Sequence, residues 1–583
     1  MPTRTLTARL GDHTVDTRMV VLCLMAVVIG IGAAAGAFLL LNLITLFTNL
    51  FWFGRLSLAE AAIAANQLGP WGVLPPVVGA LVVGLMARYG SEKIRGHGIP
   101  EAMETILYGE SRLSAKVALL KPVSSAVSIG SGGPFGAEGP IIMTGGAIGS
   151  LFAQRFRLSA VERKALLVAG ASAGMTSIFG APMASVLLAV EVLLFEWKPR
   201  SLLPVIVAVL TALVCRAAWS DAGPLFPGAA PIPASAWILP GAAATGLVIG
   251  LLVAALSALL YGIEDVFESL PIHWMWWPAL GAVVVGVGGL IDPRALGAGY
   301  DNIRLLVSGE APPGSVLLLF AVKAVIWLVA LGSGTSGGVL APFLILGGAV
   351  GWLGGLALPG DSGFWAMIGM AAVMSSGMRA PLTGVLFAAE ITGRYDVLPV
   401  FLAASAVAYG VNILVTRRSI LTAKIARRGR HLLQEYGVDP LDVLQAGEVM
   451  TARPRTLPGN MIVKDAVRFF MEEARHRSYP LTDDDGRLAG LVSRSDALDW
   501  SQRTEGDADA TLVEVLSDRA QPSVGLATPC SEVADLIAQT GIGRIPVVDA
   551  DGAVVGIITR QDLLRARGTQ RRRDATRAKG AHP

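Results

Sequence analysis

Long hydrophobic runs with few charged positions occupy the chain up to about residue 428. A helix that crosses a bilayer needs about 20 apolar residues, and several of these runs are short for a straight crossing. Glycine and proline interrupt many of them, which is tolerated at membrane depth where broken helices line a cavity. The pattern therefore predicts a helical transporter or channel, not a single anchor. The predicted spans are Met19–Trp52, Trp71–Met86, Leu202–Ala217, Ala236–Tyr261, Trp274–Ile291, Val316–Leu331 and Val397–Val415.

Composition and charge placement agree with a membrane protein. The 583 residues are 53% hydrophobic and only 16% charged, and the net charge is +3. Basic residues flank the first and last spans, which favours a multi-pass protein of the plasma or inner membrane with both termini cytoplasmic. The first run is too long and starts too late for a secretory signal. The flanking residues are Arg4, Arg9, Arg18, Arg417, Arg418, Lys424, Arg427, Arg428 and Arg430.

The character of the chain changes after Arg430. Two similar stretches follow, in which short β-branched segments alternate with amphipathic ones, and each predicts a small α/β module. The basic end is expected to be a solvated tail, attracted to anionic lipid rather than to nucleic acid. The predicted boundaries are a cytoplasmic N-terminus (1–18), a membrane domain (19–428), a linker (429–446), two modules (447–503 and 511–568) and a tail (569–583).

The membrane domain contains a weak internal repeat, with halves at about 19–220 and 235–428. Gly180–Glu191 resembles Arg379–Glu390, and Gly130-Ser131-Gly132 recurs as Gly332-Ser333-Gly334. Matching interrupted segments predict a substrate site near the midplane, at the interface of the repeats. The alternative is a chance recurrence of small-residue patterns.

Three motifs place glycines just before a proline and an apolar run: Gly96–Pro100, Gly136–Pro140 and Gly337–Pro342. Glycine allows backbone to approach an ion closely, and proline suits the first turn of a helix. Three helix N-termini that converge would surround a halide with N–H groups without a full cation. Such binding is weak enough for the ion to leave again.

Glu138 is the most informative residue, because a charge at the bilayer centre costs about 2.5–3.5 kcal/mol on insertion scales. It lies in a glycine-rich stretch, two residues before Pro140. At a helix start, its carboxylate would occupy a place that attracts anions. We interpret it as a gate that competes with a permeating anion; the alternative is a capping carboxylate without a role in transport.

The motifs GHGIP, GAEGP and GGVLAP, in this order, together with APMA, APLT and GAGYDN, resemble those of the CLC family of chloride channels and chloride/proton antiporters. The two C-terminal modules resemble a pair of CBS domains. The resemblance implies an all-α polytopic membrane protein (the inverted-repeat CLC fold, with broken helices) followed by a cytoplasmic α/β CBS pair. It also implies a homodimer in which each subunit has its own pathway.

The resemblance assigns roles to individual positions. Glu138 matches the gating glutamate, and His97 stands where many members have a serine. A protonated His97 would tighten anion binding and add pH sensitivity, whereas a neutral one bonded to backbone would be structural. The anion-binding positions implied are His97, Gly98, Gly139, Val339 and Leu340, the last two through backbone N–H groups.

Two departures from the family pattern bear on mechanism. Val192 occupies the position of the proton-transfer glutamate of many antiporters, and valine carries no proton. Leu421 replaces a tyrosine at the inner constriction, which should be more open or more hydrophobic. Glu191 and Glu390, which end the two matched segments, are expected to be structural partners at the repeat interface.

In the CBS pair, Ser493 with Asp496 and Thr559 with Asp562 match the pattern that holds the ribose and phosphate of an adenine nucleotide. The alternative is a plain dimerisation module. The expected function is chloride transport through a glutamate-gated pathway, with a voltage- or pH-gated channel favoured over a chloride/proton antiporter.

A CBS-regulated cation transporter ranks lower, since it requires acidic side chains along the pathway. The expected partners are chloride, protons and membrane lipid, with no nucleic acid. Neither an enzyme nor a metal centre is expected, because phosphate-binding loops, nucleophile triads and metal-ligand clusters are not apparent and the three cysteines are scattered.

Overall fold

The computed structural model describes residues 18–221, 223–228, 230–428, 441, 444–502, 509–517 and 522–567. The chain divides into two compact units, one within His13–Glu435 and one within Tyr436–Pro583. The predicted N-terminal segment, most of the linker and the basic tail lie outside the described residues.

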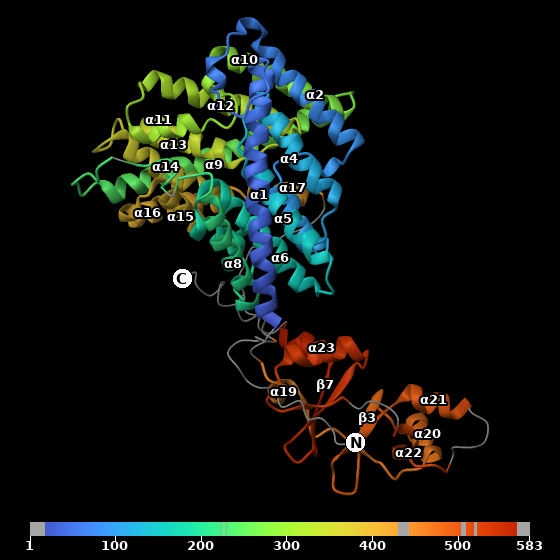
Figure 1. The fold of residues 1–583 in the computed structure, drawn as a ribbon. Helices are drawn as coiled ribbons and strands as arrows, with labels where there is room; N and C mark the ends of the chain where they lie inside the picture. Colours follow the sequence, from blue (N-terminus) through green and yellow to red (C-terminus); the bar gives the residue numbers. More distant parts are fainter. Residues whose placement is uncertain are drawn as a thin grey trace. The chain divides into compact units, whose positions relative to one another are not determined.

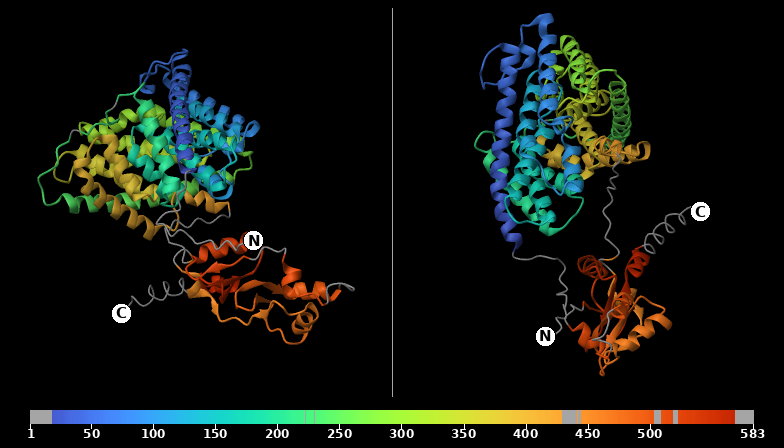
Figure 2. Two further views of the ribbon diagram at one scale, coloured as in Figure 1. Left: turned by 60° about the horizontal axis from the view of Figure 1, so that its bottom comes forward. Right: turned by 90° about the vertical axis from the view of Figure 1, so that its right-hand side faces the viewer.

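The first unit is built of helices (Figure 1). Those of its first half are α1 (Arg18–Phe53), α2 (Leu74–Tyr89), α3 (Ile99–Tyr108), α4 (Ala115–Gly130), α5 (Glu138–Gln154), α6 (Ala160–Phe179), α7 (Pro182–Leu188) and α8 (Pro199–Arg216). Those of its second half are α9 (Ile238–Glu268), α10 (Trp277–Ile291), α11 (Tyr300–Ser308), α12 (Pro313–Gly332), α13 (Leu340–Gly354), α14 (Ser362–Met378), α15 (Pro381–Thr392), α16 (Leu398–Val415) and α17 (Thr422–Arg427). Both views of Figure 2 show the two halves side by side.

Seven helices in the described residues are long and apolar enough to cross a membrane, and they confirm the seven predicted spans. The largest difference is at α9, which continues past Tyr261 to Glu268. Its last turns are acidic, and Arg427 donates to Asp265 at 2.6 Å. An ion pair at the end of the apolar run explains why the helix extends beyond the hydrophobic pattern.

The core lies where short, deeply buried helices cross. α5 packs on α6 and α13 packs on α14, and most residues of these four helices are buried. A Cβ on Gly145 would lie 2.2 Å from the carbonyl oxygen of Gly170, and one on Gly369 would lie 2.1 Å from that of Gly347. Small residues let helix backbones approach closely inside a membrane protein. The two halves thus use the same device at matching positions.

The second unit contains two small sheets, with strand orders β1-β7-β6-β5 and β2-β3-β4. In the antiparallel pairs, Tyr479 of β3 lies opposite Val492 of β4 and Ile545 of β6 lies opposite Ile558 of β7. The strands are β1 (Thr451–Ala452), β2 (Leu457–Pro458), β3 (Ser478–Thr482), β4 (Leu488–Ser493), β5 (Val524–Gly525), β6 (Arg544–Val548) and β7 (Val554–Thr559). The helices are α19 (Ala446–Val449), α20 (Val463–Glu472), α21 (Arg494–Gln502), α22 (Leu512–Leu516) and α23 (Cys530–Thr540).

The two modules of this unit are not independent. β1, at the start of the first module, pairs with β7 of the second, and Thr451 lies opposite Ile557. The internal duplication seen in the sequence therefore folds as one unit. The predicted fold class, a polytopic helical membrane protein with an α/β module pair, is confirmed.

Candidate anion-binding site

The three glycine loops meet at one place inside the first unit. The N–H of Gly338 donates to the carbonyl of Gly136 at 2.9 Å, and the N–H of Gly136 donates back at 3.3 Å. A Cβ on Gly139 would lie 1.8 Å from the carbonyl oxygen of His97 and 3.3 Å from the Cα of Gly338. The N-terminal ends of α3, α5 and α13 are therefore close together, as the motifs predict.

Gly98 shows why the first loop requires glycine. Its φ is +91°, a backbone conformation that side chains disfavour, and a Cβ there would lie 2.7 Å from the carbonyl oxygen of Gly139. Its N–H donates to the Glu101 carboxylate at 3.0 Å. In this structure, Gly98 thus permits the close approach of α3 to α5, while its N–H is hydrogen-bonded to Glu101.

Glu138 is the first residue of α5 and is completely buried. Its Oε1 accepts a hydrogen bond from the Tyr300 hydroxyl at 3.4 Å, and its carboxylate also interacts with the N–H of Ala341 in the first turn of α13. Its Oε2 has no hydrogen-bond partner among the described residues. A Cβ on Gly136 would lie 1.9 Å from that oxygen. The carboxylate therefore lies between the starts of α5 and α13, where a negative charge is favoured.

Val339 and Leu340 lie at the start of α13, as the N-cap residue and the first helical residue, and both are buried. The first N–H groups of a helix have no partner within that helix. The backbone N–H groups of Val339 and Leu340 are those to which the family resemblance assigns anion binding.

His97 is buried beside the start of α3, and its Nδ1 has no hydrogen-bond partner among the described residues. Nearby, Glu101 forms an ion pair with Lys424 of α17 at 3.0 Å, and Arg428 lies 3.8 Å from the same oxygen. The sequence motifs did not predict this pair. A signal was present, since an acidic residue follows GHGIP directly and a basic one lies in the short last helix.

Two buried lysines hold the loops that precede the site. Lys121 Nζ donates to the carbonyls of Ile94 at 2.8 Å and Gly96 at 2.7 Å, and to Ser336 Oγ at 3.0 Å. Lys323 Nζ donates to the carbonyls of Ala295 and Gly297, both at 2.8 Å. The ammonium group of Lys121 is thus enclosed by these acceptors. Lys323 repeats Lys121 after about 200 residues.

The positions that depart from the family pattern are both buried. Val192 lies in a π-helical segment, Ala189–Leu194, that continues α7. Leu421 directly precedes α17, and the neighbouring carbonyl of Ile420 accepts a hydrogen bond from the Tyr261 hydroxyl at 2.8 Å. A tyrosine from α9 thus reaches the segment that contains Leu421, by a contact that sequence did not indicate.

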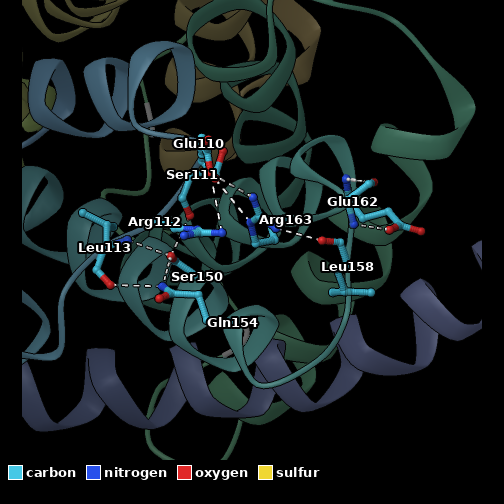
Figure 3. A network of polar contacts seen from close by, with 10 residues as sticks. Glu110, Ser111, Arg112, Leu113, Ser150, Gln154, Leu158, Glu162 and Arg163 are labelled. Carbon is cyan, nitrogen blue, oxygen red and sulfur yellow. Dashed lines mark hydrogen bonds and ion pairs between the residues drawn. The ribbon is translucent and has the colours of Figure 1, made fainter. Parts of the chain in front are cut away.

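The end of α5 opposite to Glu138 is anchored by a polar network (Figure 3). Ser150 Oγ donates to the carbonyl of Ser111 at 2.7 Å and accepts from the N–H of Leu113 at 2.9 Å. Gln154 Nε2 donates to the carbonyl of Leu113 at 3.1 Å. The helix that begins with Glu138 is therefore fixed at its other end.

In the second unit, each predicted nucleotide-binding pair forms the same local structure. Asp496 accepts from the N–H of Ser493 at 2.8 Å and from its hydroxyl at 2.6 Å. Asp562 accepts from the N–H of Thr559 at 2.9 Å and from its hydroxyl at 2.6 Å. One oxygen of each aspartate therefore caps the N-terminus of the helix in which that aspartate lies. Across the described ranges, no cluster of three or more His, Cys, Asp or Glu side chains is arranged to hold a metal ion.

The chain is similar to known membrane proteins. The family model described as voltage gated chloride channel matches residues 78–412, and the CBS domain model matches residues 446–503 and 513–568. The "voltage-gated ClC-type chloride channel ClcB" of Escherichia coli O17:K52:H18 (strain UMN026 / ExPEC) is 31% identical over 384 residues, which cover 62% of this chain and 89% of the relative. That of strain K12 / DH10B is 31% identical over 377 residues, covering 61% and 88%.

Solved structures share the fold. A slow cyanobacterial Cl⁻/H⁺ antiporter aligns with a TM-score of 0.62 at 21% identity, covering 71% of this chain and 99% of its own. A eukaryotic CLC transporter aligns with a TM-score of 0.59 at 20% identity, covering 94% and 99%. A CLC-type fluoride/proton antiporter aligns with a TM-score of 0.60 at 22% identity, covering 70% and 98%. Together with the glutamate at the junction of the glycine loops, these matches show that the chain belongs to the CLC family and carries a C-terminal pair of CBS domains.

Proposed function

We propose that this protein conducts chloride through a pathway that Glu138 gates. The observation that carries the proposal is the burial of one carboxylate between the N-terminal ends of α5 and α13, next to N–H groups. A halide that enters competes with the carboxylate for the same favourable potential. Displacement or protonation of Glu138 opens the pathway.

The passive, gated channel is the preferred mechanism. Val192 has no ionisable group at the position where many antiporters carry their second glutamate, and the curated relatives carry the name channel. The chloride/proton antiporter is the second candidate, favoured by the names of two structural neighbours.

Parallel recordings of chloride and proton flux in proteoliposomes separate the two mechanisms. A channel passes chloride without moving protons uphill. Uphill proton movement driven by a chloride gradient, and abolished by Glu138→Ala, would establish the antiporter instead.

The gate is tested by Glu138→Gln, which imitates the protonated side chain. We expect higher chloride flux and the loss of its pH dependence, with the exposed Glu310→Gln as the control. Unchanged flux and unchanged pH response would refute the gate.

His97 is the proposed side-chain contact for the anion, because its ring is buried and one ring nitrogen has no partner among the described side chains. His97→Ser should change the permeability ratio of chloride to nitrate or fluoride. A fixed ratio would make His97 a structural residue.

The protein is further proposed to function as a homodimer with one pathway per subunit, in the inner or plasma membrane with both termini cytoplasmic. Apolar side chains of α1 and α9, such as Leu24, Leu39 and Leu251, are exposed and suit contact with lipid. Crosslinking in native membranes and accessibility labelling of engineered terminal cysteines test these points.

The CBS pair is proposed to bind an adenine nucleotide through Ser493, Asp496, Thr559 and Asp562. One oxygen of each aspartate caps a helix, and carboxylates suit ribose hydroxyls. Asp496→Asn and Asp562→Asn should weaken binding of ATP in calorimetry while the protein stays folded. Absence of binding by the unmodified protein would leave the pair as a dimerisation module.

A further inference from the structure

We propose that Tyr300 is a positioning residue for the gate: its hydroxyl holds the Glu138 carboxylate in the place where it blocks the pathway. This inference rests on the proposed function of Glu138. Tyr300 is the first residue of α11, and its hydroxyl donates to Glu138 Oε1 at 3.4 Å. The contact joins helices of the two halves of the membrane unit.

The ring of Tyr300 is held by neighbouring aromatic side chains. It packs edge-on against Phe179 with a centroid distance of 6.4 Å and lies tilted against Phe226 at 5.9 Å. Phe179 itself packs on Phe387 at 5.0 Å. Edge-to-face and tilted pairs of this kind are favourable aromatic arrangements. The hydroxyl is thereby aimed at Glu138.

The loop before α11 is also fixed. Lys323 holds the carbonyls of Ala295 and Gly297, and Asn302 Nδ2 donates to the carbonyl of Arg294 at 2.7 Å. Arg294 in turn forms a two-point ion pair with Asp292, at 2.8 and 2.9 Å. A loop held at several backbone positions places the Tyr300 side chain reproducibly.

Comparison of the two repeats separates the role of the hydroxyl from that of the loop. The segment Gly297–Tyr300 repeats the segment Gly96–Ile99. Both glycines of each segment have a positive φ. The first repeat begins its helix with Ile99, which has no hydroxyl. The turn therefore does not require a hydroxyl. The hydroxyl of Tyr300 contacts the Glu138 carboxylate and also interacts with the backbone N–H of Ala137, at the start of the same helix.

The contact favours the closed gate because a hydroxyl that donates to a carboxylate stabilises the ionised form. Among the described residues, the titratable groups that interact with Glu138 from packed elements are Tyr300 of α11 and Lys323 of α12. Protonation of Glu138 weakens its oxygen as an acceptor for Tyr300 and removes the negative charge that attracts Lys323, so both interactions become weaker. The hydrogen bond between Tyr300 and Glu138, which we call the latch, thus becomes weaker under the conditions that neutralise Glu138.

Tyr300→Phe tests the latch, because it keeps the ring and removes only the hydroxyl. Chloride flux of the full chain in proteoliposomes should rise about three- to tenfold at neutral pH, the effect of losing one typical hydrogen bond. The pH at which flux is half-maximal should move upward. The exposed Tyr395→Phe is the matched control and should change neither quantity.

The same substitution is then made in the Glu138→Gln background, where it should have no further effect. Unchanged flux and pH profile of Tyr300→Phe, with flux raised by Glu138→Gln, would overturn the latch and leave the gate. Failure of Glu138→Gln itself would overturn the proposed function. If Tyr300→Phe lowers the melting temperature, the double variant decides: a structural defect lowers flux in that background too, whereas a lost latch does not.

Discussion

The carboxylate of Glu191 accepts two hydrogen bonds from Thr383, one from its N–H at 2.8 Å and one from its hydroxyl at 2.6 Å. The second repeat returns the contact, since Glu390 accepts from the N–H groups of Met183 at 2.9 Å and Ala184 at 2.8 Å. Glu191 of the first half thus caps α15 of the second half, and Glu390 of the second half caps α7 of the first. A carboxylate at a helix N-terminus satisfies free N–H groups and complements the helix dipole. The predicted structural role of both glutamates at the repeat interface is confirmed.

Removal of this capping should loosen the interface of the repeats. We expect Glu390→Ala to lower the free energy of unfolding by about 1–3 kcal/mol, because buried N–H groups lose their acceptor. Glu390→Gln keeps one acceptor oxygen and should cost less. Thermal unfolding of the purified protein measures both, with the exposed Glu310→Ala as the control. Equal stability of Glu390→Ala and Glu310→Ala would contradict the capping role.

Alanine substitutions at two glycines close to Glu138 should have different effects on folding and on chloride flux. A Cβ on Gly136 would lie 1.9 Å from an oxygen at the flexible end of Glu138, whereas one on Gly139 would lie 1.8 Å from the backbone oxygen of His97. Gly136→Ala should displace the carboxylate and raise chloride flux severalfold, about as the loss of one typical hydrogen bond does. Gly139→Ala should prevent correct folding, seen as loss of the monodisperse peak in size-exclusion chromatography. Lower flux in a well-folded Gly136→Ala would contradict this assignment.

The buried lysines should matter through the carbonyls that they hold. Lys121→Met keeps most of the volume but leaves the carbonyls of Ile94 and Gly96 without their donor, at about 1–3 kcal/mol for each unsatisfied group. We expect a lower melting temperature and weaker chloride binding in calorimetry, because the loop before α3 shifts. Lys121→Arg should restore part of both. Normal chloride affinity in Lys121→Met would show that the loop keeps its position without the lysine.

The network of Figure 3 allows a matched pair of serine substitutions. Ser150→Ala removes a hydroxyl that donates to Ser111 and accepts from Leu113, and should cost about 1–2 kcal/mol of stability. Ser172 is equally buried, but its hydroxyl has no partner among the described residues, so Ser172→Ala should be neutral. Chemical denaturation in detergent compares the two. Similar losses for both would mean that the network does not anchor α5.

Cys530 should react slowly with thiol reagents in the folded protein. Burial, followed by the negative charge of Glu448, raises the pKa of its thiol to about 11. Compared with a thiol whose pKa is 9.0, a thiol whose pKa is about 11 has a thiolate fraction at pH 8 that is about a hundredfold lower. Alkylation of the Cys530 peptide, followed by mass spectrometry, should be correspondingly slow until the protein unfolds.

The same change in pKa predicts how the stability of the second unit depends on pH. The pKa of Cys530 is higher in the folded state than in the unfolded state. Its contribution to the free energy of unfolding is therefore complete below the unfolded pKa, near pH 9, and is lost as the pH rises to about 11. Cys530→Ala should lack this decline. Rapid alkylation at neutral pH, or the same decline in the variant, would contradict the assignment.

The sequence by itself determined the spans, the two-part organisation and the identity of the key motifs. Apolar runs are continuous in sequence, and a helix in a membrane satisfies its own backbone groups, so the seven spans are local properties. Gly-Pro motifs at helix starts are local as well, which is why α3, α5 and α13 begin where the motifs predict.

The contacts between distant segments were decided only by the tertiary structure. The sequence does not show that Lys424 pairs with Glu101, that Lys323 holds the loop before Tyr300, or that β1 completes the sheet of the other CBS module. These contacts join residues that are far apart along the chain, and they depend on how helices cross and which strand edges are free. Charge type and spacing identify candidates for such contacts, but packing selects the partners, because most buried polar groups are hydrogen-bonded to whichever partner the fold brings near them.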